Sequence, residues 1–551
     1  MRVTISRSKS AEQVYITKAY RDETGKSTSK IIKKLGSMAS LLPEDDNDRE
    51  KVLAWARELA EEYTRAEKNN TLKLSIDLSE DKQISFNEIS TCNGGYLFLQ
   101  RIFYELGLDD ICKDICKDHG FEYDLSQILA CLIYERILSP SSKLSSFFSM
   151  QHMLKKPSFK LHDLYRALDV LDEESDLIQS ILYKRNRAKR NTSVLYYDCT
   201  NFFFEIEEES GIRKYGRSKE HRPNPIVQMG LFMDNKGIPI TYELFPGNTN
   251  DCLTYRPNLG RIKKQFDLGR VISVADKGMT TGDNIWYTIN TPAHDGYVFS
   301  MSIRGAEKGI KDYILKEEGY EWFGTEYKRK SRKCPRTIQV TSVTGKKIKK
   351  QVDEKQVVFW SEKYATRAKA EREAALIKAR DLAENPGNYS RATSYGAAKY
   401  VKKIDYDKET GEILTSSSIL NLDEEKIREE EALDGYYMLL TSEMEASDDE
   451  IIDMYRGLWR IEESFKVTKS ELEARPVYVW TKEHIEAHFL TCFVALTIAR
   501  ILENKLEHKY SVGTILESLS KAECSLVQQN YYLFDYYDEL LKDIGLIMDI
   551  D

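Results

Sequence analysis

The sequence predicts an α/β protein in which a long helical segment is followed by a mixed sheet. Residues 86–190 have the 3.6-residue hydrophobic period of helices, and at residue 191 the pattern changes to the alternation and apolar runs of strands. The first three strands are expected at 194–198, 226–233 and 238–245. Two helices and two further strands then alternate, at 252–266, 270–275, 282–290 and 297–303. This order predicts an antiparallel meander that continues into parallel crossovers.

Ahead of the helical segment, the chain has the pattern of a small basic hairpin. Two strand-like runs, Gln13–Tyr20 and Ser27–Lys34, flank a turn-rich segment at 22–25. Residues 1–41 carry nine basic and three acidic residues. An amphipathic helix is expected at 45–68, because acidic residues precede a helical hydrophobic period there.

Within the helical segment, one helix is expected over Leu125–Leu138, because Ser139 and Pro140 end its apolar period. A further short helix is expected from Ser142. Helix, tight turn and helix are typical of a helix-turn-helix DNA-binding module, although ordinary helical hairpins have the same pattern.

The segment 306–446 departs from the rhythm of the sheet. Strands are expected at 356–360 and 436–441, with a long charged helix between them, so we predict a β-rich insertion. From residue 451 onward the pattern is helical. The predicted organisation is a basic N-terminal region, a helical domain, the first part of the catalytic domain, its insertion, its second part and an acidic helical tail, at 1–85, 86–190, 191–305, 306–446, 447–510 and 511–551.

The net charge of −8 excludes only a uniformly basic surface, because the charges are segregated along the chain. The segment 327–350 carries ten basic residues and no acidic one, whereas 423–450 carries twelve acidic residues and two basic ones. Hydrophobic residues at 41% and charged residues at 31% are ordinary for a folded globular protein and exclude a disordered chain.

The cytoplasm is the expected compartment. Nine cysteines, an odd number in 551 residues, do not suggest a disulfide scaffold and suit a reducing environment. The first residues lack the apolar core of a signal peptide, and no continuous apolar run reaches the 18 residues that would predict a membrane span. We therefore expect no membrane association.

Three acidic residues occupy positions where a carboxylate is unusual. Asp198 and Asp276 each follow an apolar strand, and in open α/β sheets ligands bind beyond the strand ends. Glu462 is expected on the apolar stripe of a helix, with the next residue rotated toward solvent. Ordinary explanations also exist: strand-end aspartates cap turns, and Glu462 has ion-pair partners in Lys466 and Lys469.

Together, the three carboxylates suit a divalent metal site. Mg²⁺ and Mn²⁺ prefer oxygen ligands and keep coordination positions open for water and phosphate. Two such ions activate the attacking oxygen and stabilise the leaving oxygen in phosphodiester displacement. We therefore expect two Mg²⁺ (or Mn²⁺) ions.

These segments resemble the DDE transposases of bacterial insertion sequences. The resemblance is carried by Asp198 in YYDCTNFFFE, Asp276 in VADKGM, and the helix with Tyr455, Glu462 and Lys469. It implies a catalytic domain with the ribonuclease H-like fold and an N-terminal region that binds DNA. It also implies that the three carboxylates are the metal ligands, with Asp198 bridging the two ions.

Three further features are similar to the transposase subgroup with a Tyr-Arg-Glu-Lys signature. They are the segment YGRSKEHRP at 215–223, the segment RPVY at 475–478, and the β-rich insertion between the second Asp and the Glu. One position departs from that signature, because Leu458 stands where the Arg is expected. Arg456 or Arg460 could supply the missing charge from another angle.

The resemblance implies that Tyr455 and Lys469 contact DNA phosphates near the cleavage point. Basic residues of the Glu helix and of the basic segment are further expected DNA contacts: Arg460, Lys466, Lys328, Arg329, Lys330 and Arg332. Trp360, in the insertion, is a candidate for stacking on a flipped base, although a core tryptophan in a strand fits its position as well.

The expected function is that of a transposase. It would bind the terminal inverted repeats of its element, cleave the DNA with divalent metal, and transfer the 3′-OH end into target DNA, as a dimer in the synaptic complex. The alternatives are a DNA-binding protein on the same fold that has lost catalysis, for which Leu458 leaves room, and a general nuclease.

Overall fold

The structure is a computed structural model that describes residues 1–7, 12–21, 26–41, 49–70, 91–187, 190–384, 396–406, 417–528 and 531–550. The chain divides into two compact units. The first comprises residues 1–86 with 527–531, and the second comprises residues 87–526 with 532–551. Each unit is described by itself below.

The first unit is a three-stranded antiparallel sheet packed on a helix. Its elements are β1 (Arg2–Arg7), β2 (Glu12–Arg21), β3 (Ser27–Ser37), α1 (Met38–Leu41) and α2 (Arg49–Asn70). Val14 from the sheet and Val52, Leu53 and Ala56 from α2 form its small core. The predicted hairpin and helix are found, and β1 is an additional strand. The predicted turn at 22–25 lies outside the described residues.

The second unit begins with a helical part, as predicted. After the short strand β4, its helices are α3 (Tyr96–Glu105), α4 (Leu108–His119), α5 (Leu125–Leu138), α6 (Lys143–Ser149), α7 (Leu161–Glu173) and α8 (Ser175–Asn186). Side-chain caps from Asp124 and Ser142 begin α5 and α6. However, α6 exposes Leu144 and Phe148 and buries Lys143, which is not the basic face of a DNA-recognition helix.

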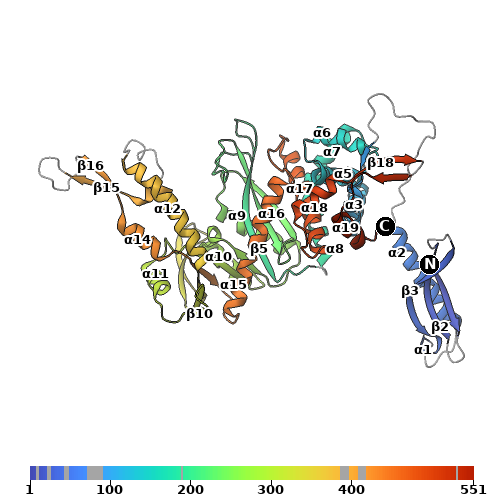
Figure 1. Cartoon of the computed structure of the whole chain (residues 1–551), viewed down its shortest axis with the longest axis horizontal. Helices are drawn as coiled ribbons and strands as arrows, with labels where there is room; N and C mark the ends of the chain where they lie inside the picture. Colours follow the sequence, from blue (N-terminus) through green and yellow to red (C-terminus); the bar gives the residue numbers. More distant parts are fainter. Residues whose placement is uncertain are drawn as a thin grey trace. The chain divides into compact units, whose positions relative to one another are not determined.

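A nine-stranded mixed sheet forms the centre of the second unit (Figure 1). Its spatial order is β10-β11-β14-β17-β9-β8-β5-β6-β7. The strands are β5 (Val194–Phe203), β6 (Ile226–Asp234), β7 (Pro239–Pro246), β8 (Ile272–Ala275), β9 (Gly296–Ser300), β10 (Glu321–Phe323), β11 (Tyr327–Lys333), β14 (Lys355–Ser361) and β17 (Tyr436–Thr441). The strands β5, β8 and β9 are parallel neighbours, and the other pairs are antiparallel. The predicted meander and crossovers are therefore found.

Helices cover both faces of this sheet, which explains why β5 and β6 are buried almost throughout. One core contains α9 (Asp251–Gln265) and α10 (Gly282–Ile289). The other contains α16 (Trp459–Ser470) and α17 (Lys482–Lys505). An 18-residue window of α17 has a mean hydropathy of 1.7, so by length and composition the helix could cross a membrane, but 89% of that window is buried in the protein.

The predicted insertion is not a separate sheet, because four of its strands, β10, β11, β14 and β17, extend the central sheet. Two hairpins of the segment stand apart from that sheet: β12 (Arg336–Thr341) with β13 (Lys347–Val352), and β15 (Val401–Tyr406) with β16 (Ser417–Leu422). The helices of the segment are α11 (Lys308–Leu315), α12 (Glu362–Glu384) and α14 (Glu424–Ala432).

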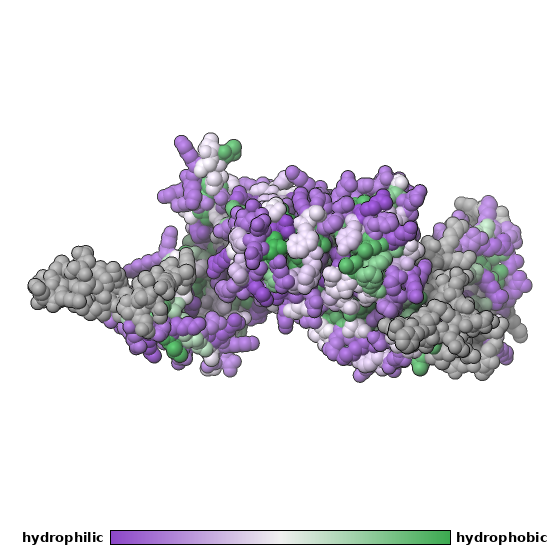
Figure 2. Space-filling view, turned by 90° about the horizontal axis from the view of Figure 1, so that it is seen from above, coloured by the Kyte–Doolittle hydropathy of each residue, from purple (hydrophilic) through white to green (hydrophobic). Residues whose placement is uncertain are grey.

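The C-terminal part contains α15 (Asp448–Arg456), α16, α17, α18 (Val512–Lys521) and α19 (Glu539–Met548). Between α18 and α19, the strands β18 (Glu523–Gln528) and β19 (Tyr531–Phe534) form a small sheet with β4 (Thr91–Asn93). The segment 511–551, expected to be a helical tail, therefore also holds two strands. Figure 2 shows a mostly hydrophilic surface that is interrupted by small hydrophobic patches.

Candidate active site

Strand register places Asp198 beside Asp276. The parallel pairing of β5 with β8 ends at Tyr197 and Ala275, so the two aspartates are the next residues on neighbouring strands. The prediction that Asp198 ends its strand is wrong, because β5 continues to Phe203. Asp198 instead lies where the parallel partner of β5 ends, which is the edge of the sheet at which a ligand can approach.

The next strand adds a hydroxyl to this edge. The pairing of β8 with β9 ends at Ala275 and Phe299, so Ser300 is the residue that follows in register beside Asp276. The Ser300 hydroxyl donates a hydrogen bond to Asp276 Oδ1 at 2.9 Å. Thr280 Oγ1 donates to the Ser300 carbonyl at 2.6 Å, which fixes the end of β9. Asp276 is thereby oriented toward the edge.

Burial raises the pKa of the Asp198 carboxyl to about 6. The positive charge of Lys219 and the backbone N–H of Cys199, which donates to Asp198 Oδ1 at 2.7 Å, oppose this shift. The negative charges of Asp276 and Asp251 add to it. Burial therefore disfavours the charged form of Asp198, and no described residue forms an ion pair with this carboxylate.

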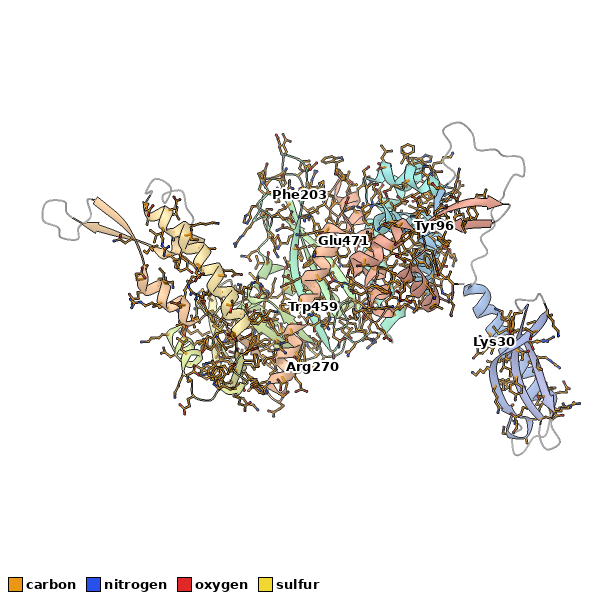
Figure 3. The ribbon with its side chains drawn as sticks, viewed as in Figure 1. Lys30, Tyr96, Phe203, Arg270, Trp459 and Glu471 are labelled. Carbon is orange, nitrogen blue, oxygen red and sulfur yellow. The ribbon has the colours of Figure 1, made fainter. Side chains whose placement is uncertain are left out.

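Glu462 reaches the same edge from α16, which packs along β5 (Figure 3 labels Trp459 and Glu471 at the two ends of the helix). The prediction that Glu462 occupies the buried stripe is wrong, because its side chain is exposed. The next residue, Glu463, was expected to face solvent, but it is half-buried and accepts a hydrogen bond from Arg500 Nη1 at 3.0 Å. The solvent-facing carboxylate of this helix is thus Glu462.

The three carboxylates share one electrostatic environment. Partial desolvation and then the charge of Asp276 raise the pKa of Glu462, while Arg367 and Lys219 lower it. Asp276 therefore acts on both Asp198 and Glu462. Within the described ranges, no three His, Cys, Asp or Glu side chains stand close enough to form a ready-made metal cluster.

This donor set fits a hard divalent cation. All three groups are carboxylates, and their mutual repulsion is the kind that a bound cation relieves. The residues that would hold the metal are Asp198, Asp276 and Glu462.

Tyr455 also lies at this edge, but on a different helix from Glu462. The expected single helix is broken at Gly457 between α15 and α16. A Cβ atom at Gly457 would lie 1.8 Å from the Tyr196 hydroxyl oxygen, so this close approach requires glycine. Burial raises the pKa of Tyr455, which hydrogen bonds with Ser300 and is close to Asp276.

Lys469 lies behind Asp198 in a half-buried position. Its Nζ donates to Glu220 Oε1 at 3.1 Å and lies 5.5 Å from the centroid of the Phe202 ring. Burial lowers the pKa of Lys469 to about 8, and the charge of Lys219 adds to this effect while Asp198 opposes it. Two lysines and a glutamate thus flank Asp198.

The other basic positions of the Glu helix differ in their accessibility. Lys466 is exposed. Arg460 is half-buried and bonds the Tyr196 hydroxyl, which supports the helix rather than reaching into solvent. Leu458, at the position expected to hold an arginine, is 6% exposed and belongs to the core. Leu458 itself supplies no charge to the edge.

The basic strand β11 directs two predicted DNA contacts inward. Lys328 is 4% exposed, and its Nζ lies 2.6 Å from Glu317 Oε1 among the rings of Tyr320, Trp322, Trp360 and Tyr436. Lys330 is 5% exposed and donates to the carbonyl oxygens of Tyr313 and Lys316, both at 2.5 Å. In this conformation neither ammonium group reaches a phosphate.

The remaining predicted contacts of this region also have internal partners. Arg329 forms an ion pair with Asp449, and Arg332 Nε donates to Gln356 Oε1 at 2.8 Å. Trp360 is half-buried in β14, and its Nε1 donates to the Asp434 carbonyl at 3.0 Å. These contacts agree with the structural explanation of Trp360 rather than with an exposed stacking platform.

Several charged residues of the site were not assigned a role from the sequence. Lys219 donates to the Cys199 carbonyl and lies 3.6 Å from Asp251 Oδ2. Glu220 accepts from Lys469 and also pairs with Arg475. The sequence did single out these residues, because they lie in the segments 215–223 and 475–478. Their roles could not be assigned from the sequence, because only tertiary contacts join the two segments.

A family model described as "Transposase DDE domain" matches residues 201–498, which include Asp276 and Glu462 and begin three residues after Asp198. No curated protein matches the sequence.

Two solved structures are similar to the chain. One is a cryo-EM structure of the piggyBac transposase synaptic complex with hairpin DNA, at 10% identity and a TM-score of 0.36, covering 84% of this chain and 75% of that one. The other is the Mos1 transposase paired-end complex with the left transposon end, at 16% identity and a TM-score of 0.12, covering 46% and 70%. At these scores neither structure defines the fold of this chain.

Proposed function

Because the chain belongs to the transposase DDE domain family, we propose that it is a metal-dependent DNA transposase with Asp198, Asp276 and Glu462 as its metal ligands. The observation that carries the proposal is the register of β5 and β8, which sets Asp198 and Asp276 side by side where their pairing ends. Since the family match begins after Asp198, the assignment of Asp198 rests on this register and on the electrostatic environment that it shares with Asp276.

The strand arrangement supports a ribonuclease H-like catalytic domain. An antiparallel meander, β5 to β7, is followed by β8 and β9, which add in parallel on the other side of β5. We place the first carboxylate on the first strand of this unit, the second after its fourth strand, and the third on a helix that packs on the first strand.

The chemistry that two divalent ions supply when bound is activation of the attacking oxygen and stabilisation of the leaving oxygen of a phosphodiester. The residues of this chain orient the carboxylates that would hold the ions. Ser300 orients Asp276 by its hydrogen bond, and the Cys199 N–H orients Asp198. Lys219 and Lys469 place positive charge beside Asp198, where a DNA phosphate would enter.

The proposed reaction is cleavage at the ends of a mobile element followed by transfer of the freed 3′-OH to target DNA. Tyr455 and Lys469 are the proposed phosphate contacts nearest the carboxylates, and Lys466 extends them along α16. The basic first unit is a proposed binding region for the terminal inverted repeats. Joining two ends requires at least a dimer during the reaction.

The test is cleavage of DNA carrying the element's own ends by the purified full-length protein with Mg²⁺ or Mn²⁺. We expect Asp198→Asn and Glu462→Gln each to reduce cleavage and strand transfer at least about 1,000-fold, because each removes a ligand charge. DNA affinity measured in EDTA should stay within about twofold. Glu463→Gln is the matched control, since Glu463 lies beside Glu462 but pairs with Arg500.

The second candidate function is DNA binding without catalysis, and the buried Leu458 is the observation that favours it. Wild-type protein that binds the ends but neither cuts nor joins them with either metal would establish this alternative. Cleavage by the Asp198→Asn variant at the wild-type rate would instead show that the ligand assignment is wrong.

A further inference from the structure

A second concave surface lies near the carboxylate edge, at the segment 475–481. The backbone N–H of Val477 donates to the carbonyl of Phe203, the last residue of β5, at 3.3 Å. Two residues earlier, Arg475 pairs with Glu220, which also accepts the hydrogen bond from Lys469. The segment is therefore tied to the charged groups behind Asp198 at one end, and it continues away from them along the surface.

A groove of about 530 Å³ follows this segment. Three aromatic rings line it: Tyr478 and Trp480 from the segment and Tyr165 from α7. Tyr478 is 53% exposed and Trp480 is 55% exposed. An aromatic groove of this kind can hold a flat ring by stacking.

Lys143 also lines the groove, and its environment calls for an anion. The residue is 4% exposed, and it makes no hydrogen bond or ion pair with any part of the chain that the structure describes. Burial lowers the pKa of Lys143 to about 7, and the positive charge of Arg136 adds to this effect. A buried ammonium group without an acidic partner is unfavourable unless a ligand supplies the negative charge.

The histidine of the groove does not supply that charge. His484 lines the groove, and its Nε2 lies 3.3 Å from Asp169 Oδ1, so this acid already has a partner. The groove thus combines exposed aromatic rings with one unpaired, buried cation. A nucleotide offers both complementary parts, a flat base and a phosphate.

We propose that this groove binds an unpaired nucleotide of a DNA strand, with its base stacked against Tyr478 and Trp480 and a phosphate oxygen at Lys143. The inference rests on the proposed function, because it identifies the partner as the DNA substrate. It adds that the protein holds part of that DNA as a single strand, outside the carboxylate edge.

The test is equilibrium binding of a fluorescently labelled single-stranded oligothymidylate to the full-length protein in EDTA. We expect Trp480→Ala and Tyr478→Ala each to weaken binding about 5- to 50-fold, the loss typical of one stacked base. Tyr537→Ala is the matched control, because Tyr537 is also exposed, at 59%, and does not line the groove. Unchanged affinity in both groove variants would overturn the proposal.

Lys143→Met separates a ligand-binding lysine from one that is only buried. We expect the variant to melt at a higher temperature, because it removes an unpaired buried charge, and yet to bind the oligonucleotide more weakly, with a salt slope smaller by about 0.7. Higher stability with unchanged affinity would show that Lys143 does not meet a phosphate.

Two further outcomes distinguish this proposal from its competitors. If the groove variants change the sedimentation of the protein but not its DNA affinity, the groove binds a second copy of the chain and the proposal fails. Because binding is measured in EDTA, Asp198→Asn should bind like wild type. If the cleavage experiment shows that the proposed metal ligands are wrong, the proposal for the groove still stands. If the groove variants bind DNA like wild type, the proposed metal ligands still stand.

Discussion

The carboxylate edge and the basic strand β11 are both charged regions of one sheet, but they differ in whether their charged groups have partners within the protein. At the edge, burial raises the pKa of both Asp198 and Glu462 and the charge of Asp276 adds to both shifts, and neither carboxylate forms an ion pair with a described residue. Along β11, Lys328 and Lys330 are buried, and each ammonium group is matched by oxygen atoms or aromatic rings. A protein keeps unbalanced charge where an external ligand completes it, and it balances charge where the fold needs it.

The difference matters for assigning function from charge. The ten basic residues of 327–350 form the densest basic segment named above, yet at least two of them serve the interior of the sheet. The three carboxylates are spread over 265 positions of the sequence and meet only through strand register and helix packing. Local charge density along the sequence therefore does not show which charged side chains are accessible to a ligand.

The largest effect expected at the carboxylate edge is stabilisation by metal. Mn²⁺ at about 100 times its dissociation constant should stabilise the wild-type protein by about 2.7 kcal/mol, and Asp276→Asn should abolish the shift, because it removes the carboxylate that acts on both others. In EDTA the same variant should melt at or above the wild-type temperature, since it relieves repulsion. Thermal melting with and without Mn²⁺ measures both effects.

Asp267→Asn is the control for this experiment, because the Asp267 side chain is 88% exposed and, among the described residues, its ion pair is with a surface arginine, Arg187. It should keep the full Mn²⁺ shift. An Asp276→Asn protein that is still stabilised by Mn²⁺ would remove the contrast between the two regions, because the edge would then not need its unbalanced charge.

Lys328→Met should lower the stability of the protein without changing its binding of a ligand. We expect the free energy of unfolding to fall by about 2 kcal/mol, because the variant removes the ion pair with Glu317 and the contact of a cation with four aromatic rings. DNA affinity and its salt dependence should stay at the wild-type values. Chemical denaturation and DNA titration measure the two quantities.

Lys349→Met provides the matched loss of charge, because Lys349 is exposed on β13. It should leave the stability within about 0.5 kcal/mol of wild type. If Lys328→Met instead weakened DNA binding without loss of stability, β11 would have to open in the DNA complex, and the distinction drawn here would be wrong.

Much of the fold could be predicted from the sequence, because its signals are local. The helix over Leu125–Leu138 follows from its apolar period and its Pro stop, and the order of β5 to β9 follows from strand and helix periods. The family resemblance, stated from short motifs, is confirmed by the family match. The predicted boundaries of two elements were wrong. The strand β5 runs five residues beyond Asp198, and the helix expected to carry Glu462 is divided at Gly457.

The side-chain environment could not be predicted, because it depends on contacts between distant segments. Glu462 has apolar residues three and four positions away on its helix, yet the buried stripe passes beside it and leaves Glu462 exposed. On β11, Lys328 and Lys330 are two residues apart and so share one face, which is a readable signal. That this face is the inner one depends on Tyr313, Tyr320 and Tyr436, which belong to other elements.

A third group of acids tests whether crowded carboxylates alone imply a metal site. Burial, with Asp172 and Asp176 nearby, raises the pKa of Glu486 on α17 to about 7. The folded-state pKa lies above the ordinary value of 4.5, so the wild-type protein loses stability as the pH rises from about 4.5 to about 7. Glu486→Gln should therefore gain about 1–2 kcal/mol at pH 8 and nothing at pH 4.

The measurement is the difference in unfolding free energy between Glu486→Gln and wild type across this pH range. Cleavage activity and the Mn²⁺ shift should be unchanged, because Glu486 is not among the charged groups that shift the pKa of Asp198 or Glu462. A loss of the Mn²⁺ shift in this variant would mean that carboxylate crowding, and not position at the sheet edge, determines where metal binds.

Lys466 gives the smallest and most discriminating effect, because it is a predicted DNA contact that is exposed. Lys466→Gln should leave the melting temperature unchanged and weaken duplex DNA binding about two- to fivefold, with a salt slope smaller by about 0.9. Lys328→Met is the comparison variant, for which we expect lower stability and an unchanged salt slope.

Lys466 carries its charge on the same helix as Glu462, one turn further along, so a phosphate bound there lies on the path to the carboxylates. If Lys466→Gln had the same salt slope as wild type, as is expected for Lys328→Met, DNA would not pass along α16. The basic residues that guide DNA to the edge would then have to come from other elements.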